Sequence, residues 1–220
     1  MKQRNTFLEL LIWALMLVPL AYLFIVWQQL PDRVPIHFNY KGEADDWGSK
    51  TFLAGLIVFM TAGINLLLLA IPRIDPKDKI AHMGSKYHQS RLLLAFFMAA
   101  LSVFIVYSAK TGSLESSNFV NVLVGALFIS FGNYFQAIKP NYFLGIRTPW
   151  TLESETVWRK THRLGGRLWI VGGAIMCLSA LFHNPEIRML FFLGTAAIVV
   201  AIPVIYSFIL SRREQHINQL

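Results

Sequence analysis

Six long apolar segments occupy most of this 220-residue chain and leave few folds open to it. A helix needs about 20 mostly apolar residues to cross the hydrocarbon core of a bilayer. The fifth segment is the shortest, and its boundaries are the least sharply marked. We therefore predict an all-α polytopic membrane protein with six transmembrane helices, at residues 7–27, 51–71, 92–109, 119–138, 168–182 and 189–210.

The composition agrees with a membrane protein. Hydrophobic residues make up 55% of the chain and charged residues only 15%, whereas a soluble domain of this length would need more charge to cover its surface. The single cysteine, Cys177, lies in an apolar segment and allows neither an intramolecular disulfide nor a cysteine-based metal site. The chain carries no cofactor motif, so no cofactor and no metal are assigned.

The positions of lysine and arginine predict the orientation in the membrane. Of the 20 such residues, 15 fall in the N-terminus, the loop 72–91, the loop 139–167 and the C-terminus. Because positive loops stay in the cytoplasm, both termini and these two loops are predicted to lie inside, and the loop 31–50 outside. The net charge of +8 then reflects topology, and no direct nucleic-acid partner is predicted. The first apolar segment is too long for a signal peptide and is interpreted as an uncleaved helix.

Charged residues are predicted to stay out of the membrane interior. Arg91 is assigned to the loop 72–91, and Glu9 to the first helical turn, from where it can reach the interface. Ion-coupled transporters retain buried ionisable groups, so this pattern argues against one. The polar residues inside the segments suggest hydrogen bonds between helices, and glycines suggest close helix packing; they are Asn65, Asn121, Asn133, Gln136, Gly63, Gly125, Gly132, Gly172 and Gly173. Asn133 and Gln136 adjoin the loop 139–167, so a functional role is an equal alternative for them.

The loop 139–167 has an unusually specific composition. A turn at Gly145 and a short amphipathic helix from Thr148 or Thr151 to Gly165–Gly166 are predicted, because threonine caps helices and glycine ends them. Trp150 and Trp158 fit an interfacial anchor. The guanidinium of Arg147, with its fixed fork of donors, fits a specific site equally well.

A family resemblance rests on the same loop and the helix before it. The region resembles the SdpI-type family of bacterial integral membrane immunity proteins, whose namesake gives immunity to a secreted toxic peptide. The resemblance implies immunity to a membrane-active toxin and, further, recruitment of a cytoplasmic transcriptional repressor once toxin is present. The loop would then be an inner structural lock or the signalling output, and both stay open. The residues that carry the resemblance are Asn133, Lys139, Pro140, Asn141, Gly145, Ile146, Arg147, Thr148, Pro149, Trp150, Thr151, Leu152, Trp158, Arg159, Lys160, Thr161, His162 and Gly165.

The loop 31–50 resembles a short domain of unknown function that often precedes the SdpI-type region. Residues 34–40 alternate as an extended segment, Gly42 turns the chain, and Ser49 or Thr51 can cap the next helix. A restrained loop carrying an aromatic residue suits ligand recognition. A divalent-cation site at His37, Glu43, Asp45 and Asp46 is the alternative, as is a solvated turn. The candidates for facing a ligand or toxin are His37, Asn39, Glu43, Asp45 and Trp47.

Three function classes follow from the sequence. The first is an immunity protein, not an enzyme, with membrane lipids, a secreted toxin peptide and a repressor as partners. The second is a small-molecule or ion transporter or channel. The third is a membrane-embedded hydrolase, for which His162 with Glu155 is the one conceivable pair. The predicted organisation is a helical hairpin over 1–71, a basic loop and third helix over 72–118, and an SdpI-type region over 119–220.

Overall fold

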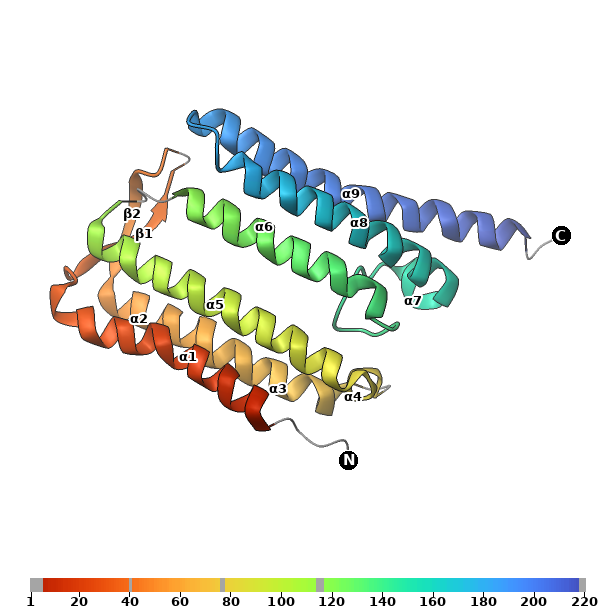
Figure 1. The fold of residues 1–220 in the computed structure, drawn as a ribbon, viewed down its shortest axis with the longest axis horizontal. Helices are drawn as coiled ribbons and strands as arrows, with labels where there is room; N and C mark the ends of the chain where they lie inside the picture. The colour runs from red at the N-terminus through yellow and green to blue at the C-terminus, as the bar shows by residue number, and fades with distance from the viewer. Residues whose placement is uncertain (1–5, 40, 76–77, 114–116, 218–220) are drawn as a thin grey trace. The chain divides into compact units, whose positions relative to one another are not determined.

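The computed structural model describes residues 6–39, 41–75, 78–113 and 117–217, which form helices joined by short loops and one β-hairpin (Figure 1). The chain divides into two compact units, Met1–Ala70 with Tyr87–Leu123, and Ile71–Lys86 with Val124–Leu220. Lys2, Arg4 and Lys77, which entered the charge count above, lie outside the described residues. The elements are α1 (Thr6–Val26), η1 (Trp27–Gln29), β1 (Arg33–Phe38), β2 (Ala44–Ser49), α2 (Lys50–Val58), η2 (Phe59–Gly63), α3 (Ile64–Ile74), α4 (Lys79–Met83), α5 (Ser85–Thr111), α6 (Ser117–Tyr134), η3 (Phe135–Ala137), α7 (Pro149–Glu153), α8 (Glu155–Ser179) and α9 (Pro185–Ile217).

Five helical stretches among the described residues are long and apolar enough to cross a membrane. They are Thr6–Gln29, Lys50–Ile74, Ser85–Thr111, Asn118–Ala137 and Pro185–His216. The helical fold class and five of the six expected spans are thus confirmed. The remaining expected span, residues 168–182, falls mostly within α8, whose first half carries Arg159, Lys160 and Arg163. A sixth crossing stays a prediction.

The first unit contains α1, η1, the β-hairpin, the helix formed by α2, η2 and most of α3, nearly all of α5, and the first turns of α6 (Figure 1). Its main core lies where the hairpin meets the helices. There the buried residues Leu23, Leu30, Val34, Ile57 and Val106 pack together. Each such side chain removed from water contributes roughly 1.5–3 kcal/mol. The packing of this core therefore fixes the hairpin on the ends of the helices.

The second helix of this unit is interrupted by a π-helical turn, Phe59–Gly63. Thr61 is fully buried within it, and its hydroxyl donates to the carbonyl of Ile57 over 2.7 Å. A side-chain hydroxyl that competes for a backbone acceptor is a recognised cause of such irregularities. This turn was not expected from the sequence.

The β-hairpin confirms the expected turn and, over residues 34–38, the expected extended segment, whose last residue, Tyr40, lies outside the described residues. β1 and β2 pair antiparallel, with Val34 opposite Gly48 and Phe38 opposite Ala44. Gly42 adopts a φ of +86°, which glycine tolerates without steric cost. The Ser49 hydroxyl accepts from the amide of Phe52 at 3.1 Å, so Ser49 is the cap of α2. The second strand is a feature that the residue pattern did not predict.

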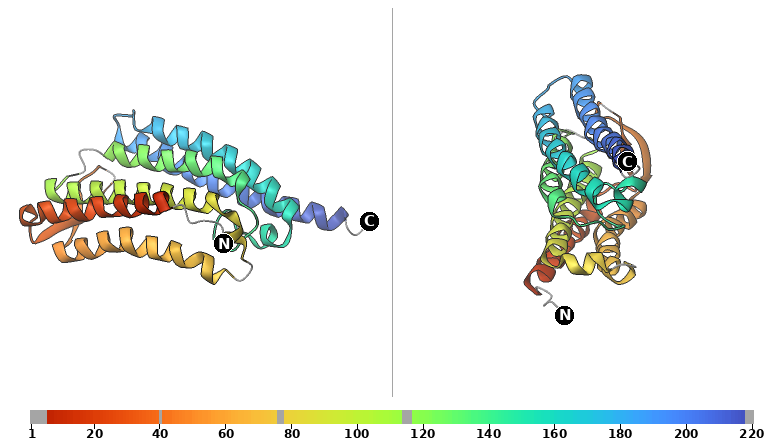
Figure 2. Two further views of the ribbon diagram at one scale, coloured as in Figure 1. Left: turned by 60° about the horizontal axis from the view of Figure 1, so that its bottom comes forward. Right: turned by 90° about the vertical axis from the view of Figure 1, so that its right-hand side faces the viewer.

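The second unit is built on α8 and α9, which run side by side in opposite directions (Figures 1 and 2). α6 packs on α8 through glycines. A Cβ added at Gly132 would lie 2.7 Å from the carbonyl oxygen of Gly166, and one at Gly125 would lie 2.6 Å from that of Gly173. The expected close helix packing at these glycines is confirmed.

The predicted helix end at Gly165–Gly166 is wrong, because α8 continues through both residues to Ser179. A Cβ at Gly165 would lie 2.5 Å from the side chain of Ile146. The two glycines therefore allow close approach of neighbouring segments and do not terminate the helix. The amphipathic helix predicted for the loop is in fact the five-residue α7 followed by the first turns of α8.

Candidate functional site

The loop before α7 is shaped by the side chain of Asn141, which is buried. Its amide nitrogen donates to the carbonyls of Lys139 (2.8 Å) and Leu144 (3.0 Å). Its oxygen accepts from the amides of Phe143 (2.8 Å) and Leu144 (2.6 Å). Asparagine is suited to such turns because its short side chain copies backbone hydrogen bonding. Asn141 thus fixes the path of residues 139–144.

Gly145 brings this loop against α8. Its φ of +103° is open to glycine, and a Cβ there would lie 2.4 Å from Nε2 of His162. The next amide, that of Ile146, donates to the same Nε2 over 3.0 Å. Nε2 is therefore unprotonated, and Nδ1 carries the proton that it donates to the carbonyl of Trp158 over 2.9 Å. Neither nitrogen of His162 is left to act as a base toward a substrate.

Trp158 joins α8 to the segment that follows η3. Its indole nitrogen donates to the carbonyl of Ile138 at 2.8 Å, and its ring stacks on that of His162 with centroids 4.0 Å apart. Phe135 contacts the His162 ring edge-on, with ring centroids 5.6 Å apart. Trp158 is 1% exposed, so in this structure it is a core residue. The alternative role as an interfacial anchor does not apply to Trp158.

Thr148 and Thr151 form a reciprocal cap at the start of α7. The Thr148 hydroxyl accepts from the amide of Thr151 (3.2 Å), and the Thr151 hydroxyl accepts from the amide of Thr148 (2.9 Å). Pro149 occupies the first turn, where proline is favoured. The Thr148 hydroxyl also lies 3.1 Å from that of Ser207, and Trp150 packs edge-on against Phe208. The predicted start at Thr148 is confirmed, and α7 is joined to α9.

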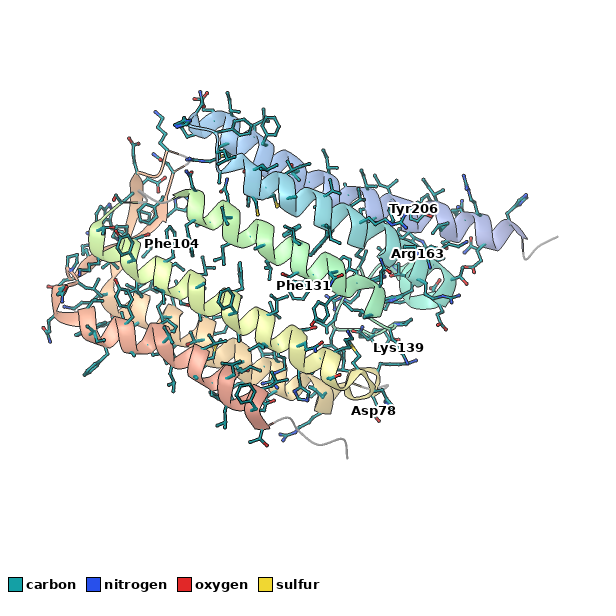
Figure 3. The ribbon with its side chains drawn as sticks, viewed as in Figure 1. Asp78, Phe104, Phe131, Lys139, Arg163 and Tyr206 are labelled. Atoms are coloured by element: carbon teal, nitrogen blue, oxygen red, sulfur yellow. The ribbon has the colours of Figure 1, made fainter. Side chains whose placement is uncertain are left out.

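Not every residue of the sequence motif joins this cluster. The guanidinium of Arg147 is exposed, and its Nη1 donates back to the carbonyl of Tyr142. Asn133 is exposed on α6 and, within the described part of the chain, makes no hydrogen bond to the cluster. Lys139 and Arg163, both labelled in Figure 3, are exposed basic residues of the same unit. We call the joined residues the loop clasp; they are Asn141, Gly145, Ile146, Thr148, Thr151, Trp158 and His162.

Burial lowers the pKa of His162 from 6.5 to about 4. The unfolded chain takes up a proton below pH 6.5 while the folded chain does not, so stability is complete above pH 6.5 and is lost as pH falls toward 4. We expect a loss of about 2 kcal/mol at pH 5, measured as a falling thermal unfolding midpoint in detergent. His162→Gln can keep the acceptor for Ile146 and cannot titrate. Its midpoint should fall less over the same range, and an equal fall in both proteins would contradict the assignment.

The ligand-facing candidates of the hairpin are largely bonded to one another. Nδ1 of His37 lies 2.6 Å from a carboxylate oxygen of Asp45, and Asn39 donates to Glu43 over 2.9 Å. The Trp47 side chain is 44% exposed. Among the described residues no group of three or more His, Cys, Asp or Glu side chains gathers as metal ligands would. These polar pairs hold the shape of the hairpin.

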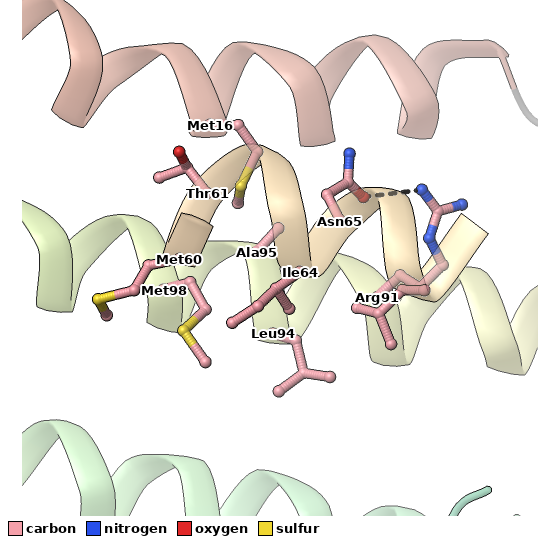
Figure 4. Close-up of a pocket in the computed structure, with 10 residues that line it drawn as sticks. Met16, Met60, Thr61, Ile64, Asn65, Arg91, Leu94, Ala95 and Met98 are labelled. Carbon is pink, nitrogen blue, oxygen red and sulfur yellow. Dashed lines mark hydrogen bonds between the residues drawn. The ribbon is translucent and has the colours of Figure 1, made fainter. Parts of the chain in front are cut away.

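A charged cluster that was not predicted from the sequence lies inside the first unit. Nη1 and Nη2 of Arg91 donate to the two carboxylate oxygens of Glu9 at 2.5 and 3.2 Å. Figure 4 shows the third bond, from Nη2 of Arg91 to the side-chain oxygen of Asn65 at 3.0 Å. Arg91 is 2% exposed and Glu9 9%. Nδ1 of His88 lies 3.3 Å from Glu9, outside hydrogen-bond geometry.

The placement of Arg91 in a loop is therefore wrong, whereas Glu9 lies in the first turn of α1, as expected, and is buried against Arg91. Arg91 lies in the second turn of α5, and a carboxylate about 80 residues away in the sequence offsets part of the cost of burying it. A charged residue inside the apolar run 7–27 was the one signal that could have revealed the pair. Asn65 joins α3 to this cluster, which fits its expected role in hydrogen bonding between helices.

Comparison with known proteins bears on the loop clasp first. Residues 137–207, from the end of η3 into α9, match the model of the SdpI/YfhL protein family. The resemblance to this family is confirmed. Residues 14–62, which include the hairpin, match a domain of unknown function, DUF1648. Both resemblances drawn from the sequence alone therefore hold.

A curated relative extends the match beyond the SdpI-type region. The chain is 24% identical over 180 residues to the "Immunity protein SdpI" of Bacillus subtilis (strain 168), covering 80% of this chain and 84% of the relative. No solved structure matches the chain. The loop clasp lies entirely inside the SdpI-type match, while Glu9, Asn65 and Arg91 lie outside both matched regions.

Proposed function

We propose that the chain is an integral membrane immunity protein that protects its bacterium from a secreted toxic peptide. The similarity to an immunity protein over four fifths of the chain carries this proposal. The five apolar helices supply the membrane location that such a role requires. Both termini, the loop 72–91 and the loop clasp face the cytoplasm in this proposal, and the hairpin faces outward, as the distribution of basic residues favours.

The hairpin region and the loop clasp then have different tasks. Because a secreted toxin arrives from outside, the hairpin region makes the first contact. The loop clasp is the inner structural lock, because the polar groups of its buried side chains bond to one another and to backbone. Recruitment of a cytoplasmic repressor would use the exposed surface beside the clasp. A pocket of about 230 Å³ there is lined by Lys79, Tyr142, Glu153 and Glu155, among others.

A toxin challenge tests the proposal. Cells of a sensitive strain that express the chain should survive a dose of the peptide fraction secreted by the strain that carries it, while cells with empty vector should die. Insertion is checked in the same cells with Lys41→Cys in a Cys177→Ala background. A membrane-impermeant maleimide should label this cysteine in intact cells. Sensitivity equal to that of the vector control, with the chain inserted, would refute the immunity role.

The buried pair Glu9–Arg91 favours a transporter as the second candidate. Ionisable groups inside a membrane often serve ion or proton movement. Here, however, the two charges neutralise each other at 2.5 Å. A transport role would require the pair to open during each cycle, and an ion flux in proteoliposomes that Arg91→Lys abolishes would establish it.

A further inference from the structure

The helix-facing side of the hairpin covers an apolar pocket in the first unit. The pocket has a cavity volume of about 200 Å³, and most of its lining is apolar. Its wall comes from four elements, β1, α2, α5 and α6, and includes Ile36, Phe38, Phe52, Phe104, Ser108 and Val120. The helical residues of this wall belong to the first turns of α2 and α6 and to the last turns of α5. The pocket therefore lies at the hairpin end of these helices.

The pocket is shaped before any ligand arrives. The pairing of β1 with β2 shifts register between Pro35 and His37, and Ile36 occupies this irregularity, a feature that redirects a side chain. A Cβ at Gly48 would lie 2.8 Å from Ile36, so glycine at this position makes room for Ile36. Phe104, which also lines the pocket, stacks on Phe119 with ring centroids 5.1 Å apart.

One buried polar group marks the pocket as a site for more than hydrocarbon. Ser108 is 2% exposed, and its hydroxyl has no hydrogen-bond partner among the described residues. A serine in a helix can ordinarily donate to a carbonyl of the preceding turn. Leaving a buried hydroxyl unpaired is unfavourable, and a ligand that offers a carbonyl or an amide would recover this cost. A lipid acyl chain offers neither group.

The mouth of the pocket is apolar as well. Ile36 is 41% exposed and Phe52 is 55% exposed, although both also line the wall. The polar candidates of the hairpin, by contrast, already bond to each other at His37–Asp45 and Asn39–Glu43. The surface of the hairpin region that is open to a ligand is therefore the apolar pocket, with the Ser108 hydroxyl in its wall.

We propose that this pocket takes up an apolar side chain of the secreted peptide, with the Ser108 hydroxyl bonding to the peptide backbone beside it. The inference rests on the proposed immunity function and names where on the chain the toxin binds. It moves the contact from the polar residues of the hairpin to the pocket that the hairpin covers. It also predicts that the peptide carries a bulky apolar residue that is essential for recognition.

Three variants at matched membrane levels test the inference. The quantity measured is the tolerated dose, the highest dose of the peptide fraction that the expressing cells survive. Val120→Trp fills the pocket and should lower the tolerated dose at least about tenfold, the effect of losing about 1.4 kcal/mol of binding. Ser108→Ala removes only the hydroxyl and should lower the tolerated dose about threefold to tenfold. Ser102→Ala is the matched control, because Ser102 lies on the same helix, is fully buried and is likewise unpaired among the described residues, but does not line the pocket. The tolerated dose of Ser102→Ala should equal that of the wild type.

The outcomes separate this inference from the function on which it rests. Lack of protection by the wild type refutes the immunity role and the pocket with it. Wild-type protection by both Val120→Trp and Ser108→Ala refutes the pocket alone, as does an equal loss in Ser102→Ala. Should Val120→Trp fail to insert, Ser108→Ala still decides.

A labelling experiment distinguishes the peptide from a lipid. A cysteine at the pocket wall, Ile105→Cys in a Cys177→Ala background, should react with a small maleimide in phospholipid nanodiscs. The peptide fraction should slow this reaction at least threefold. A cysteine that is already protected in nanodiscs without peptide would mean that a lipid chain occupies the pocket, and would overturn the proposal.

Discussion

Replacing Arg91 with alanine is expected to lower the free energy of unfolding by about 3–5 kcal/mol, the largest effect of any single change considered for this chain. The substitution leaves the Glu9 carboxylate buried without its bidentate partner at 2.5 and 3.2 Å. It also removes the donor to Asn65, so contacts to two other helices are lost at once. The measurement is unfolding in mixed micelles with increasing denaturing detergent.

The control substitutions identify the cause of this loss. Arg163→Ala removes the same side chain from an exposed position on α8 and should change the free energy by less than about 0.5 kcal/mol. The double variant Glu9→Met with Arg91→Met removes both charges together. Because a buried ion pair can be replaced by apolar groups at little cost, the double variant should be more stable than Arg91→Ala. A double variant as unstable as the single one would mean that the pair is not what stabilises this unit.

The features that were predictable from the sequence depend on local chemistry. Long apolar runs indicate membrane spans, Gly42 indicates the hairpin turn, and Thr148 followed by Pro149 indicates the start of α7. Each of these signals is contained within one short stretch of the chain and needs no distant partner. Five spans, the turn and the cap are therefore predictable from the residues alone.

The features that were missed depend on partners distant in the sequence. A positive charge at Arg91 indicates a loop until Glu9 and Asn65 are seen beside it. Gly165–Gly166 indicates a helix end until the packing partners at Gly132 and Ile146 are seen. The same holds for the hairpin, whose candidates were chosen for polarity, while its pocket is formed by apolar residues of α2, α5 and α6. Pairing across the fold, and not composition, decides each of these cases.

The loop clasp offers the second large effect, at Gly145. Gly145→Ala is expected to cost about 2–5 kcal/mol, because alanine is strained at a φ of +103° and its Cβ would meet Nε2 of His162 at 2.4 Å. Moving His162 away would also remove the acceptor of the Ile146 amide. The measurement is the thermal unfolding midpoint in detergent, together with the amount of folded protein in the membrane.

Two other glycines separate the causes of this loss. Gly112→Ala introduces alanine at a φ of +74° with no atom within 4 Å, so it reports backbone strain without a clash and should cost clearly less. Gly194→Ala lies in α9 with open space around it and should be neutral or stabilising by up to about 1 kcal/mol. A loss for Gly145→Ala no greater than that for Gly112→Ala would remove the contact with His162 from the argument. If the clasp is the inner lock, protection from toxin should fall in proportion to the folded protein that remains, because the clasp then acts by holding α7, α8 and the end of α6 together and not by contacting the toxin.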